Sequence, residues 1–424
     1  MDAIYEKMWN DLGMDIKTHD KMLAHLEKVY TKVFRSQANR PDGMKYFDGQ
    51  IDNLHSGRVM EIKEQKDRGK KVVGIFCVFV PDEITLAADA IQVGLCAGAE
   101  VGFNLAEKYL PRNTCALVKS FFGFKLTKLS PYMEIADLVV GETTCDQKKK
   151  SYEIMNDFYP LYIIEVPQRK ESCDRDLWKE EVLRFKDRIE ELTGNKITPE
   201  NLKNAIKTVN DRRRALNRLN MLRSSNPAPI SGLDCLLINQ VGFYDDPQRF
   251  THNLNILCDE LEQRIEEKSG AAGLDAARFF VTGCPMALPN WKLPMIVESM
   301  NGVIVGEEAC VGSRHTRELV DESGETLEEM LNAIVDRYLN IDCACFTPNR
   351  ERLANIVSQA RTLNADGIIN YNLTFCQPYL IETHKVEEIC RNENIPILSL
   401  ETDYSMEDRG QLKTRLEAFM EMVK

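Results

Sequence analysis

The sequence predicts an α/β protein with two domains, each built around a parallel sheet. Short apolar runs alternate with charged, helix-periodic segments, which is the pattern of strands covered by helices on both faces. The alternation occurs twice, before and after a long charged stretch. The chain has 424 residues, too many for one ordinary hydrophobic core. We therefore expect two Rossmann-like (flavodoxin-like) domains with helical additions.

The first half divides into a helical segment, residues 1–70, and a first α/β domain, residues 71–169. Leu23, Leu26, Val29 and Val33 recur at helical spacing and give the N-terminal segment an amphipathic face. From residue 72 the pattern changes to short apolar runs, which predict buried strands. Pro81-Asp82-Glu83 has the proline and acidic residues of a first helical turn. The strands expected in this domain lie within 72–79, 136–141 and 161–166.

The second half divides into a helical insertion or linker, residues 170–228, and a second α/β domain, residues 229–424. Thr198-Pro199 is a helix start signal within the insertion. The strands expected in the second domain lie within 278–283, 302–306, 366–371 and 394–400.

Composition excludes several classes of protein. The formal net charge of −12 argues against nucleic-acid binding, which normally needs a basic face. Arg212-Arg213-Arg214 is the one basic run, and we interpret it as a solvated face or an anion contact. There is no apolar stretch of about 18 residues and no export signal in the N-terminal residues. These observations predict a cytoplasmic protein that has no membrane partner.

Thirteen cysteines are the most informative feature of the composition. A large chain without an export signal is expected to stay in a reducing compartment, where retained cysteines favour metal binding or catalysis over disulfides. An odd number of cysteines also fits a complete disulfide framework poorly. The cysteines are therefore the first candidates for a functional site.

Three cysteines follow directly after predicted strands, namely Cys145, Cys310 and Cys376. In open α/β sheets, ligands bind in the crevice beyond the carboxyl ends of the strands. Cysteines at such ends of two domains are expected to face one cleft between them.

Three further cysteines, Cys96, Cys115 and Cys345, lie in comparable loops, which gives three candidates in each domain. An all-thiolate site suits zinc, Cu(I) or an iron–sulfur cluster. Structural zinc usually needs Cys-x₂₋₄-Cys pairs, and the sequence contains none. Widely spaced single cysteines favour an iron–sulfur cluster held between the domains.

The other cysteines leave alternatives open. Cys284 follows a predicted strand and competes for a ligand position, and Cys343 competes with Cys345. Cys77 and Cys235 lie among apolar residues and are interpreted as core residues. Cys173, Cys258 and Cys390 lie in helical or charged segments and are left out of the site.

Titratable residues close to the candidate cysteines are candidate proton donors. Glu142, Glu307, Glu308 and His315 lie near ligand cysteines in the sequence, where a carboxyl or imidazole group can act as a general acid. Of these we select Glu142, Glu307 and His315, and the alternative for each is a structural role. The sequence has neither a Gly-x₄-Gly-Lys-Ser/Thr loop nor a Gly-x-Gly-x-x-Gly motif after a strand, so we do not expect it to bind ATP or nicotinamide in these familiar ways.

Several segments resemble the 2-hydroxyacyl-CoA dehydratase and benzoyl-CoA reductase superfamily. The similar segments run from about residue 70 to the C-terminus in the family's order. They are Pro81-Asp82-Glu83 with Ala87-Ala88, Thr143-Thr144-Cys145-Asp146, Gly283-Cys284-Pro285, Gly306-Glu307-Glu308-Ala309-Cys310, and Asp366-Gly367-Ile368-Ile369 with Phe375-Cys376.

The resemblance implies a cofactor, partners and an activity. In dehydratase subunits three cysteines, matching Cys115, Cys145 and Cys376, hold one [4Fe–4S] cluster. The additional Cys96, Cys310 and Cys345 resemble the double-cubane cluster proteins of the same superfamily, in which six cysteines hold an [Fe8S9] cluster. Those proteins are homodimers that receive electrons from a separate ATP-hydrolysing [4Fe–4S] activator and reduce small molecules such as acetylene. Two alternatives remain: a dehydratase subunit with one [4Fe–4S] cluster, and a non-catalytic electron carrier.

Overall fold

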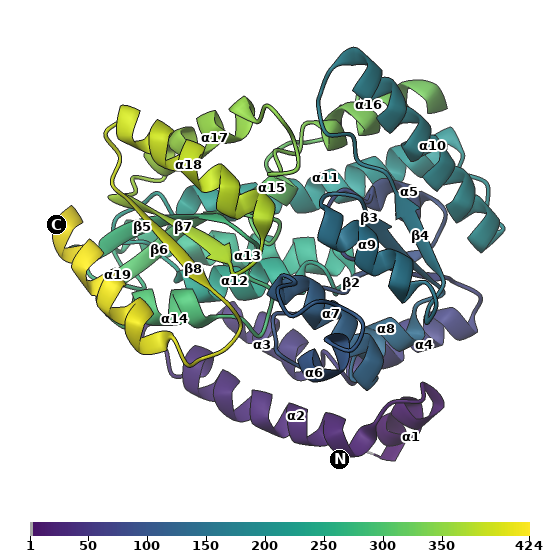
Figure 1. The fold of residues 1–424 in the computed structure, drawn as a ribbon, viewed down its shortest axis with the longest axis horizontal. Coiled ribbons are helices and arrows are strands. Elements are labelled where there is room, and N and C mark those ends of the chain that lie inside the picture. Colours follow the sequence, from purple (N-terminus) through teal and green to yellow (C-terminus); the bar gives the residue numbers. More distant parts are fainter. Residues whose placement is uncertain (1–2) are drawn as a thin grey trace.

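Two four-stranded parallel sheets form the framework of the computed structural model, which describes residues 3–424 (Figure 1). The strands lie in the order β2-β1-β3-β4 in the first sheet and β6-β5-β7-β8 in the second. Both are the flavodoxin-like order, with a switch point beside the first strand. The predicted α/β class with two Rossmann-like domains is confirmed. The first two residues of the predicted N-terminal segment lie outside the described residues.

The strands are short and mostly buried on both faces, as their apolar sequences predict. The first sheet contains β1 (Val72–Ile75), β2 (Ile91–Gly94), β3 (Leu138–Glu142) and β4 (Leu161–Ile164). The second contains β5 (Ala277–Gly283), β6 (Gly302–Glu308), β7 (Gly367–Leu373) and β8 (Ile397–Thr402). Seven of these strands fall where the sequence predicts them. The eighth, β2, was not predicted, because Gln92 and Gly94 interrupt its apolar pattern.

The helices before the second sheet include the predicted N-terminal segment and the insertion. They are α1 (Ala3–Asp11), α2 (Ile16–Tyr30), the π-helix η1 (Thr31–Arg35), α3 (Met44–Asp52), α4 (Gly57–Asp67), α5 (Asp82–Ala87), α6 (Phe103–Ala106), α7 (Ala116–Thr127), α8 (Pro131–Ile135), α9 (Asp146–Met155), α10 (Ser172–Thr193), α11 (Pro199–Leu222), α12 (Gly232–Val241) and α13 (Pro247–Glu266).

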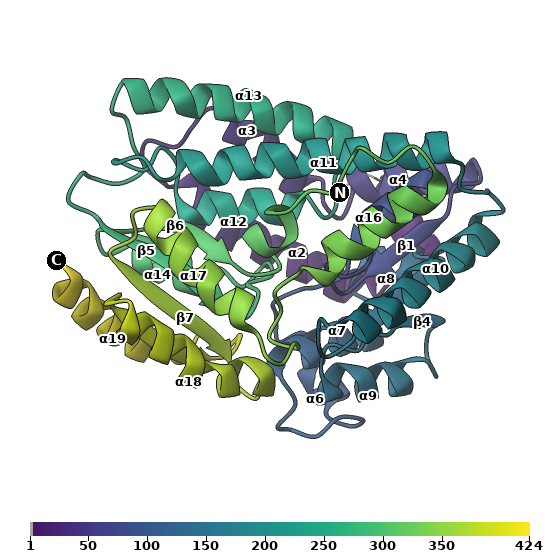
Figure 2. The ribbon, with the colours of Figure 1, turned by 90° about the horizontal axis from the view of Figure 1, so that it is seen from above.

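The remaining helices flank the second sheet. They are α14 (Lys292–Glu298), α15 (Ser313–Thr316), α16 (Leu327–Leu339), α17 (Arg350–Thr362), α18 (Gln377–Asn392) and α19 (Arg409–Val423). Figure 2 shows α11 and α13 lying side by side across the top of the molecule, whereas α17 and α18 cover the second sheet.

The basic run on α11 is largely buried, so its interpretation as a solvated face was wrong for two of its three residues. Arg212 is paired with Asp82 and Arg213 with Glu83, at the start of α5. Only Arg214 lies near the surface, where it pairs with Asp211 and Glu322. The run therefore fastens the insertion to the first domain.

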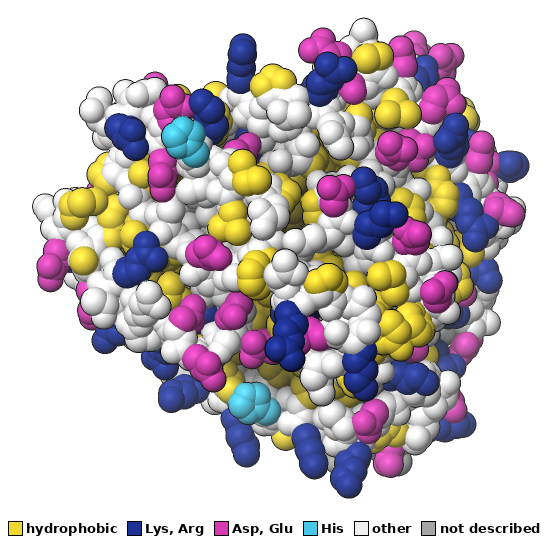
Figure 3. All heavy atoms as spheres, viewed as in Figure 1, with side chains coloured by type: hydrophobic (Ala, Val, Ile, Leu, Met, Phe, Trp, Pro, Cys, Tyr) yellow, Lys and Arg dark blue, Asp and Glu magenta, His cyan; other side chains and the backbone are white. Residues whose placement is uncertain are grey.

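Helix α2 runs along the lower side of the molecule from the first domain toward the second (Figure 1). Its predicted apolar residues Leu23, Leu26 and Val29 are only partly buried. The face seen in Figure 3 mixes acidic and basic side chains, with hydrophobic atoms visible between the two halves. Among residues 3–424, no helix is long and apolar enough to cross a membrane.

Candidate functional site

The carboxyl ends of six strands place cysteines at the junction of the two sheets. Equivalent strands of the two domains are followed by equivalent cysteines: Cys77 and Cys284 after the first strand, Cys96 and Cys310 after the second, and Cys145 and Cys376 after the third. Cys115, Cys343 and Cys345 come from the segments between the second and third strands. These nine cysteines form two groups.

The first group, which we call the helix-capping group, contains Cys115, Cys145, Cys284 and Cys376. Cys115 precedes α7, Cys145 precedes α9, and Cys376 precedes α18, each at the N-cap position. The Cys145 Sγ accepts a hydrogen bond from the Lys148 backbone N–H at 3.5 Å. A helix N-terminus carries partial positive charge, so each of these three cysteines lies beside such a charge.

Contacts hold the helix-capping group together across the two domains. The thiols of Cys115 and Cys376 are in hydrogen-bonding contact, and Cys376 also contacts Cys284. The Gln147 side chain accepts from the Cys115 backbone N–H at 2.6 Å and donates to the Phe375 carbonyl at 3.0 Å. Gln147 thereby bridges the loop of the first domain and the loop of the second.

Thiol contacts and burial raise the pKa values of Cys115, Cys145 and Cys376 in the protein without a metal. The contact with Cys376 and burial raise the pKa of Cys115 well above its ordinary value, and burial raises the pKa of Cys145. The hydrogen bond from Cys115 lowers the pKa of Cys376, but Cys284 and burial hold it well above the ordinary range. A metal that binds here must therefore displace protons.

The second group, which we call the basic group, contains Cys77, Cys96, Cys310, Cys343 and Cys345. Cys77 and Cys310 are in hydrogen-bonding contact, as are Cys343 and Cys345. The Cys96 thiol donates to the Phe76 carbonyl at 3.0 Å. Cys343 is close enough to affect the pKa of Cys310, and Cys310 is close enough to affect the pKa of Cys96.

Two buried cations accompany the basic group. The Arg314 guanidinium lies 3.5 Å from the Cys310 Sγ and is oriented by the Glu308 carboxylate. The hydrogen bond from Cys77 lowers the pKa of Cys310, and Arg314 and Lys148 lower it further. The hydrogen bond from Cys345 and the charge of Arg314 lower the pKa of Cys343 to about 6.

Lys148 connects the two groups electrostatically. Its ammonium pairs with the buried Glu142 carboxylate, which also accepts hydrogen bonds from Thr144 at 3.0 Å and Tyr152 at 3.3 Å. Burial raises the pKa of Cys145 in the helix-capping group and of Cys96 in the basic group, and the positive charge of Lys148 opposes the rise in both. One cation is thus shared by both sets of thiols.

The six predicted ligand cysteines fall into these groups as two sets of three. Cys115, Cys145 and Cys376 belong to the helix-capping group, and Cys96, Cys310 and Cys345 belong to the basic group. Each set combines two cysteines at equivalent strand ends with one cysteine from an intervening segment. Cys284 accompanies the first set, and Cys343 and Cys77 accompany the second.

The three predicted proton donors lie in different surroundings. Glu142 lies between the two groups and is held by Lys148. Glu307 is buried in a paired contact with Arg223, with both oxygens at 2.6 Å from guanidinium nitrogens. His315 stacks on Phe243, and burial lowers its pKa to about 4. The structure thus places only Glu142 beside both groups.

Sequence reasoning missed several residues of the site. Cys77 is buried in the core, as predicted, but β1 ends at Ile75, so Cys77 lies in the loop beyond the strand and its contact with Cys310 was missed. Lys148, Arg314 and Tyr404 were also missed. The spacing in the sequence could have indicated two of them. Lys148 lies three residues after Cys145 and Arg314 four residues after Cys310, and residues at these spacings lie about one helical turn apart.

Tyr404 has an unsatisfied hydroxyl group beside the cysteines. Its hydroxyl is buried and has no hydrogen-bond partner among the described residues. Burial raises the pKa of Tyr404 well above its ordinary value, and Cys96, Cys115 and Cys284 contribute to the shift. A buried hydroxyl normally has a partner, so this group is a free donor directed at the region of the thiols.

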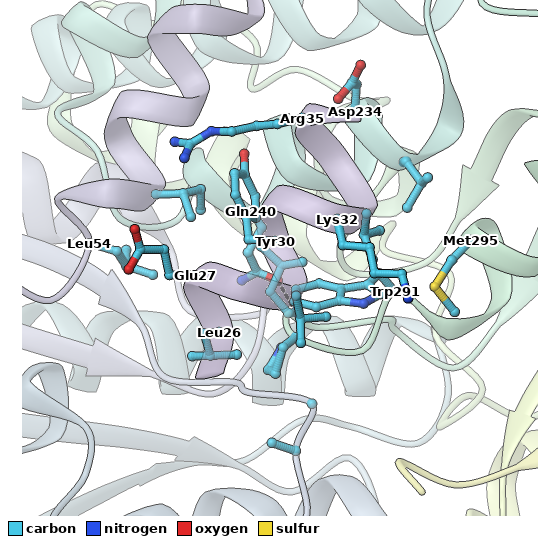
Figure 4. A pocket seen from close by; sticks show the side chains of 18 of the residues that line it. Leu26, Glu27, Tyr30, Lys32, Arg35, Leu54, Asp234, Gln240, Trp291 and Met295 are labelled. Carbon is cyan, nitrogen blue, oxygen red and sulfur yellow. Dashed lines mark hydrogen bonds between the residues drawn. The ribbon is translucent and has the colours of Figure 1, made fainter. Parts of the chain in front are cut away.

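A cavity of about 1570 Å³ adjoins the Cys96 loop on the side of α2. Figure 4 shows Leu26 and Tyr30 of α2 and Lys32 of η1 on the same cavity as Gln240 of α12, Trp291 at the N-cap of α14 and Met295 within α14. Tyr404 also lines this cavity. The cavity therefore extends from below α2 to the loop that carries Cys96.

The donor set near the junction of the sheets consists of thiols, the ligand type of sulfur-bound clusters. Among residues 3–424, no three or more His, Cys, Asp or Glu side chains converge as they do around one ion. The nearby donors are thiols in two adjacent sets, accompanied by cations and the free Tyr404 hydroxyl. Multiple thiolates suit iron–sulfur chemistry, and donors to sulfur are a normal part of such sites.

The fold and site define a two-domain α/β protein that gathers cysteines from both domains at the carboxyl ends of its strands. The model of the family described as "2-hydroxyglutaryl-CoA dehydratase, D-component" matches residues 77–423. The chain belongs to this family, and the resemblance stated from its motifs is confirmed.

Known relatives are subunits of dehydratases and reductases. The chain is 38% identical to the proposed dehydratase subunit YjiM of Escherichia coli (strain K12), over 86% of this chain and 94% of the relative. It is 25% identical to the (R)-phenyllactyl-CoA dehydratase beta subunit of Clostridium sporogenes, over 89% and 98%. It is 23% identical to a subunit of the benzoyl-CoA reductase of Thauera aromatica, over 82% and 89%.

Proposed function

We propose that the chain is the reductase component of an ATP-dependent iron–sulfur system and holds a double-cubane [Fe8S9] cluster. The proposed ligands are Cys96, Cys115, Cys145, Cys310, Cys345 and Cys376. The observation that carries the proposal is the pairing of two adjacent thiol groups, each with three of these cysteines. A single four-iron cluster needs only one such group.

The cluster would supply electrons at low potential to a small molecule, and the protein would set its potential and its access to protons. Lys148 and Arg314 place positive charge beside the sulfurs, which favours added electrons. Glu142 orients the Lys148 Nζ, the proton-bearing group between the two sets of thiols. We therefore retain Glu142 as a positioning carboxylate, because Arg223 engages Glu307 and His315 lies beside Phe243 and Asp82.

The proposed partners follow from the same assignment. Electrons would come from a separate ATP-hydrolysing [4Fe–4S] activator, and two copies of this chain would form a homodimer. The beta-subunit names of two relatives support a multi-subunit system in general.

A second candidate is a 2-hydroxyacyl-CoA dehydratase subunit with one [4Fe–4S] cluster on Cys115, Cys145 and Cys376. The relatives named as dehydratase subunits favour it, and so does the completeness of the helix-capping group by itself. A third candidate is an electron carrier that has no substrate of its own.

Anaerobic purification followed by iron and sulfide analysis separates these candidates. About eight irons per chain support two cubanes, and about four support the single-cluster dehydratase. Activator-dependent reduction of acetylene distinguishes a reductase from an electron carrier. A colourless preparation without iron would contradict every cluster assignment.

A further inference from the structure

The cavity beneath α2 is lined by apolar side chains of the helix that are only partly buried. An amphipathic helix is normally stabilised by packing its apolar face against the core. Here the middle of α2 leaves Leu23, Leu26 and Val29 partly exposed above a cavity of about 1570 Å³. These side chains therefore pack against the core and also line the cavity.

Both ends of α2 are anchored firmly. At the N-terminal end His19 is buried, with its Nε2 2.8 Å from the Nδ1 of His55 and its ring packed edge-on against Trp9. Just beyond the C-terminal end, Phe34 is fully buried in η1 and meets the Trp291 ring edge-on, with centroids 5.4 Å apart. The space beneath the middle is thus held open between two fixed points.

The inner end of the cavity reaches the candidate cluster site. Its wall contains Leu95 and Ala97, the two neighbours of Cys96 in the chain. Tyr244 and Tyr404 also line it; the Tyr244 hydroxyl donates to the Cys96 carbonyl at 3.4 Å, and the Tyr404 hydroxyl has no partner among the described residues. A molecule in this cavity would approach the Cys96 loop.

The charges of the lining disfavour a polyanion. Among the described residues, six carboxylates and four Lys or Arg side chains line the cavity. Arg35 pairs with Asp52 and Arg40 with Asp234, and without these two pairs four carboxyl groups and two cations remain in the lining. Near the inner end, burial and the neighbouring carboxylates of Asp403 and Glu407 raise the pKa of Glu100, although Lys119 and Lys292 oppose the rise. The several phosphate charges of coenzyme A would be repelled here.

We propose that this cavity is the binding site of an uncharged, largely apolar small molecule, held beneath α2 and presented to the Cys96 loop and Tyr404. The identity of this molecule as a substrate rests on the proposed function, whereas its binding does not. The apolar lining supplies the affinity, and Tyr244 and Tyr404 place aromatic side chains at the inner end of the cavity.

The test uses phenylacetylene as a neutral probe, with 4-ethynylbenzoate and coenzyme A as anionic probes. Isothermal titration of the full chain is expected to show binding of phenylacetylene, and binding at least about tenfold weaker for both anions. Equal or tighter binding of coenzyme A would overturn the proposed ligand class.

Substitutions on α2 locate the bound probe. Leu26→Trp fills the cavity and is expected to weaken phenylacetylene binding by about tenfold or more. Lys28→Trp is the matched control, because Lys28 is exposed on the same helix and is not among the lining residues. Leu23→Trp serves as a second filling variant if Leu26→Trp does not fold. Unchanged affinity for phenylacetylene in the folded filling variant would overturn the site. The site would also be overturned if only the monomer bound phenylacetylene and the dimer did not, because the second copy would then occupy the cavity.

Iron analysis of the same preparations separates this inference from the proposed function. Loss of probe binding with full iron content would confirm the cavity as the binding site and leave the cluster assignment intact. Probe binding in a preparation that cannot be loaded with iron would contradict the cluster assignment alone. Failure of the wild-type chain to bind phenylacetylene, with or without iron, would overturn the inference.

Discussion

The helix-capping group and the basic group offer positive charge to their thiols in two different ways. Around Cys115, Cys145 and Cys376 the charge comes from the N-termini of α7, α9 and α18, which are part of the backbone. In the basic group, no cysteine caps a helix in the part of the chain that the structure describes, and Arg314 supplies the charge from a side chain. The positive charge at the helix N-termini belongs to the backbone and is set by the fold. The positive charge of Arg314 belongs to a side chain and can be removed by one substitution.

The difference also appears in the protonation of the two groups. Without a metal, the pKa values of Cys115, Cys145 and Cys376 all lie above the ordinary thiol range. In the basic group the pKa of Cys310 is lowered and that of Cys343 falls to about 6, whereas those of Cys77, Cys96 and Cys345 are raised. Side-chain cations and thiol contacts therefore outweigh burial at two of the five cysteines of this group, and the helix N-termini outweigh it at none of Cys115, Cys145 and Cys376. The two groups are therefore expected to differ when loaded with metal.

The largest expected effect comes from removing one ligand from each group. Cys145→Ser and Cys310→Ser are each expected to lose about half of the iron, from about eight to about four per chain, because each group would hold its own cubane. Iron and sulfide analysis with electron paramagnetic resonance measures the loss.

The control for this pair is Cys173→Ser, since Cys173 is exposed and belongs to neither group. It is expected to retain all iron. Loss of all iron from either ligand variant would show that the two groups do not load independently, and the comparison between them would fail.

A smaller effect is expected from the charge of Arg314. Arg314→Gln removes a cation 3.5 Å from Cys310 and is expected to lower the reduction potential of the basic group's cluster by about 60 mV, a tenfold change in its one-electron equilibrium. The helix-capping group should keep its potential. Potentiometric titration followed by electron paramagnetic resonance measures both.

Arg314→Lys is the matched variant, because it keeps the charge and loses the paired contact with Glu308. It is expected to restore most of the potential. An equal shift in both variants would mean that Arg314 acts through packing instead of charge.

The shared ion pair should affect both groups by a smaller amount. Glu142→Gln removes a buried negative charge and leaves Lys148 positive, so we expect both potentials to rise, by about 30 mV each. The same titration measures them. A rise confined to one group would contradict the position of Lys148 between the two.

The smallest effect is expected from the accompanying cysteines. Cys284→Ala and Cys343→Ala are expected to keep the full iron content and to lower the free energy of unfolding by about 1 kcal/mol through lost packing. Denaturant unfolding of the metal-free chain measures the second quantity. If Cys343→Ala loses iron and Cys345→Ala keeps it, the ligand assignment of these two residues must be exchanged.

The sequence could predict the framework because apolar runs and loop cysteines are local signals. Seven strands, and the placement of Cys145, Cys310 and Cys376 just beyond them, follow from local patterns of this kind. The strand β2 was missed because Gln92, which hydrogen-bonds Thr85, makes the segment look like a loop.

The surroundings of the site could not be predicted in the same way. Glu307 lies on β6, the strand that leads to Cys310. Side chains alternate along this strand, so Glu308 reaches Arg314 whereas Glu307 pairs with Arg223. The grouping of the cysteines likewise depends on how the two domains meet, because contacts such as Cys115 with Cys376 join residues from different sheets.

The repeated strand order points to how such a site can originate. Cys96 and Cys310, and likewise Cys145 and Cys376, stand at the same step of the same topology in the two halves. A single ancestral half, paired with a copy of itself, would already have brought these four thiols together. After duplication and fusion, Cys115 in one half and Cys345 in the other could be acquired separately. When two copies are joined in one chain, each half can change separately. The two sides of an initially symmetric site can then come to differ.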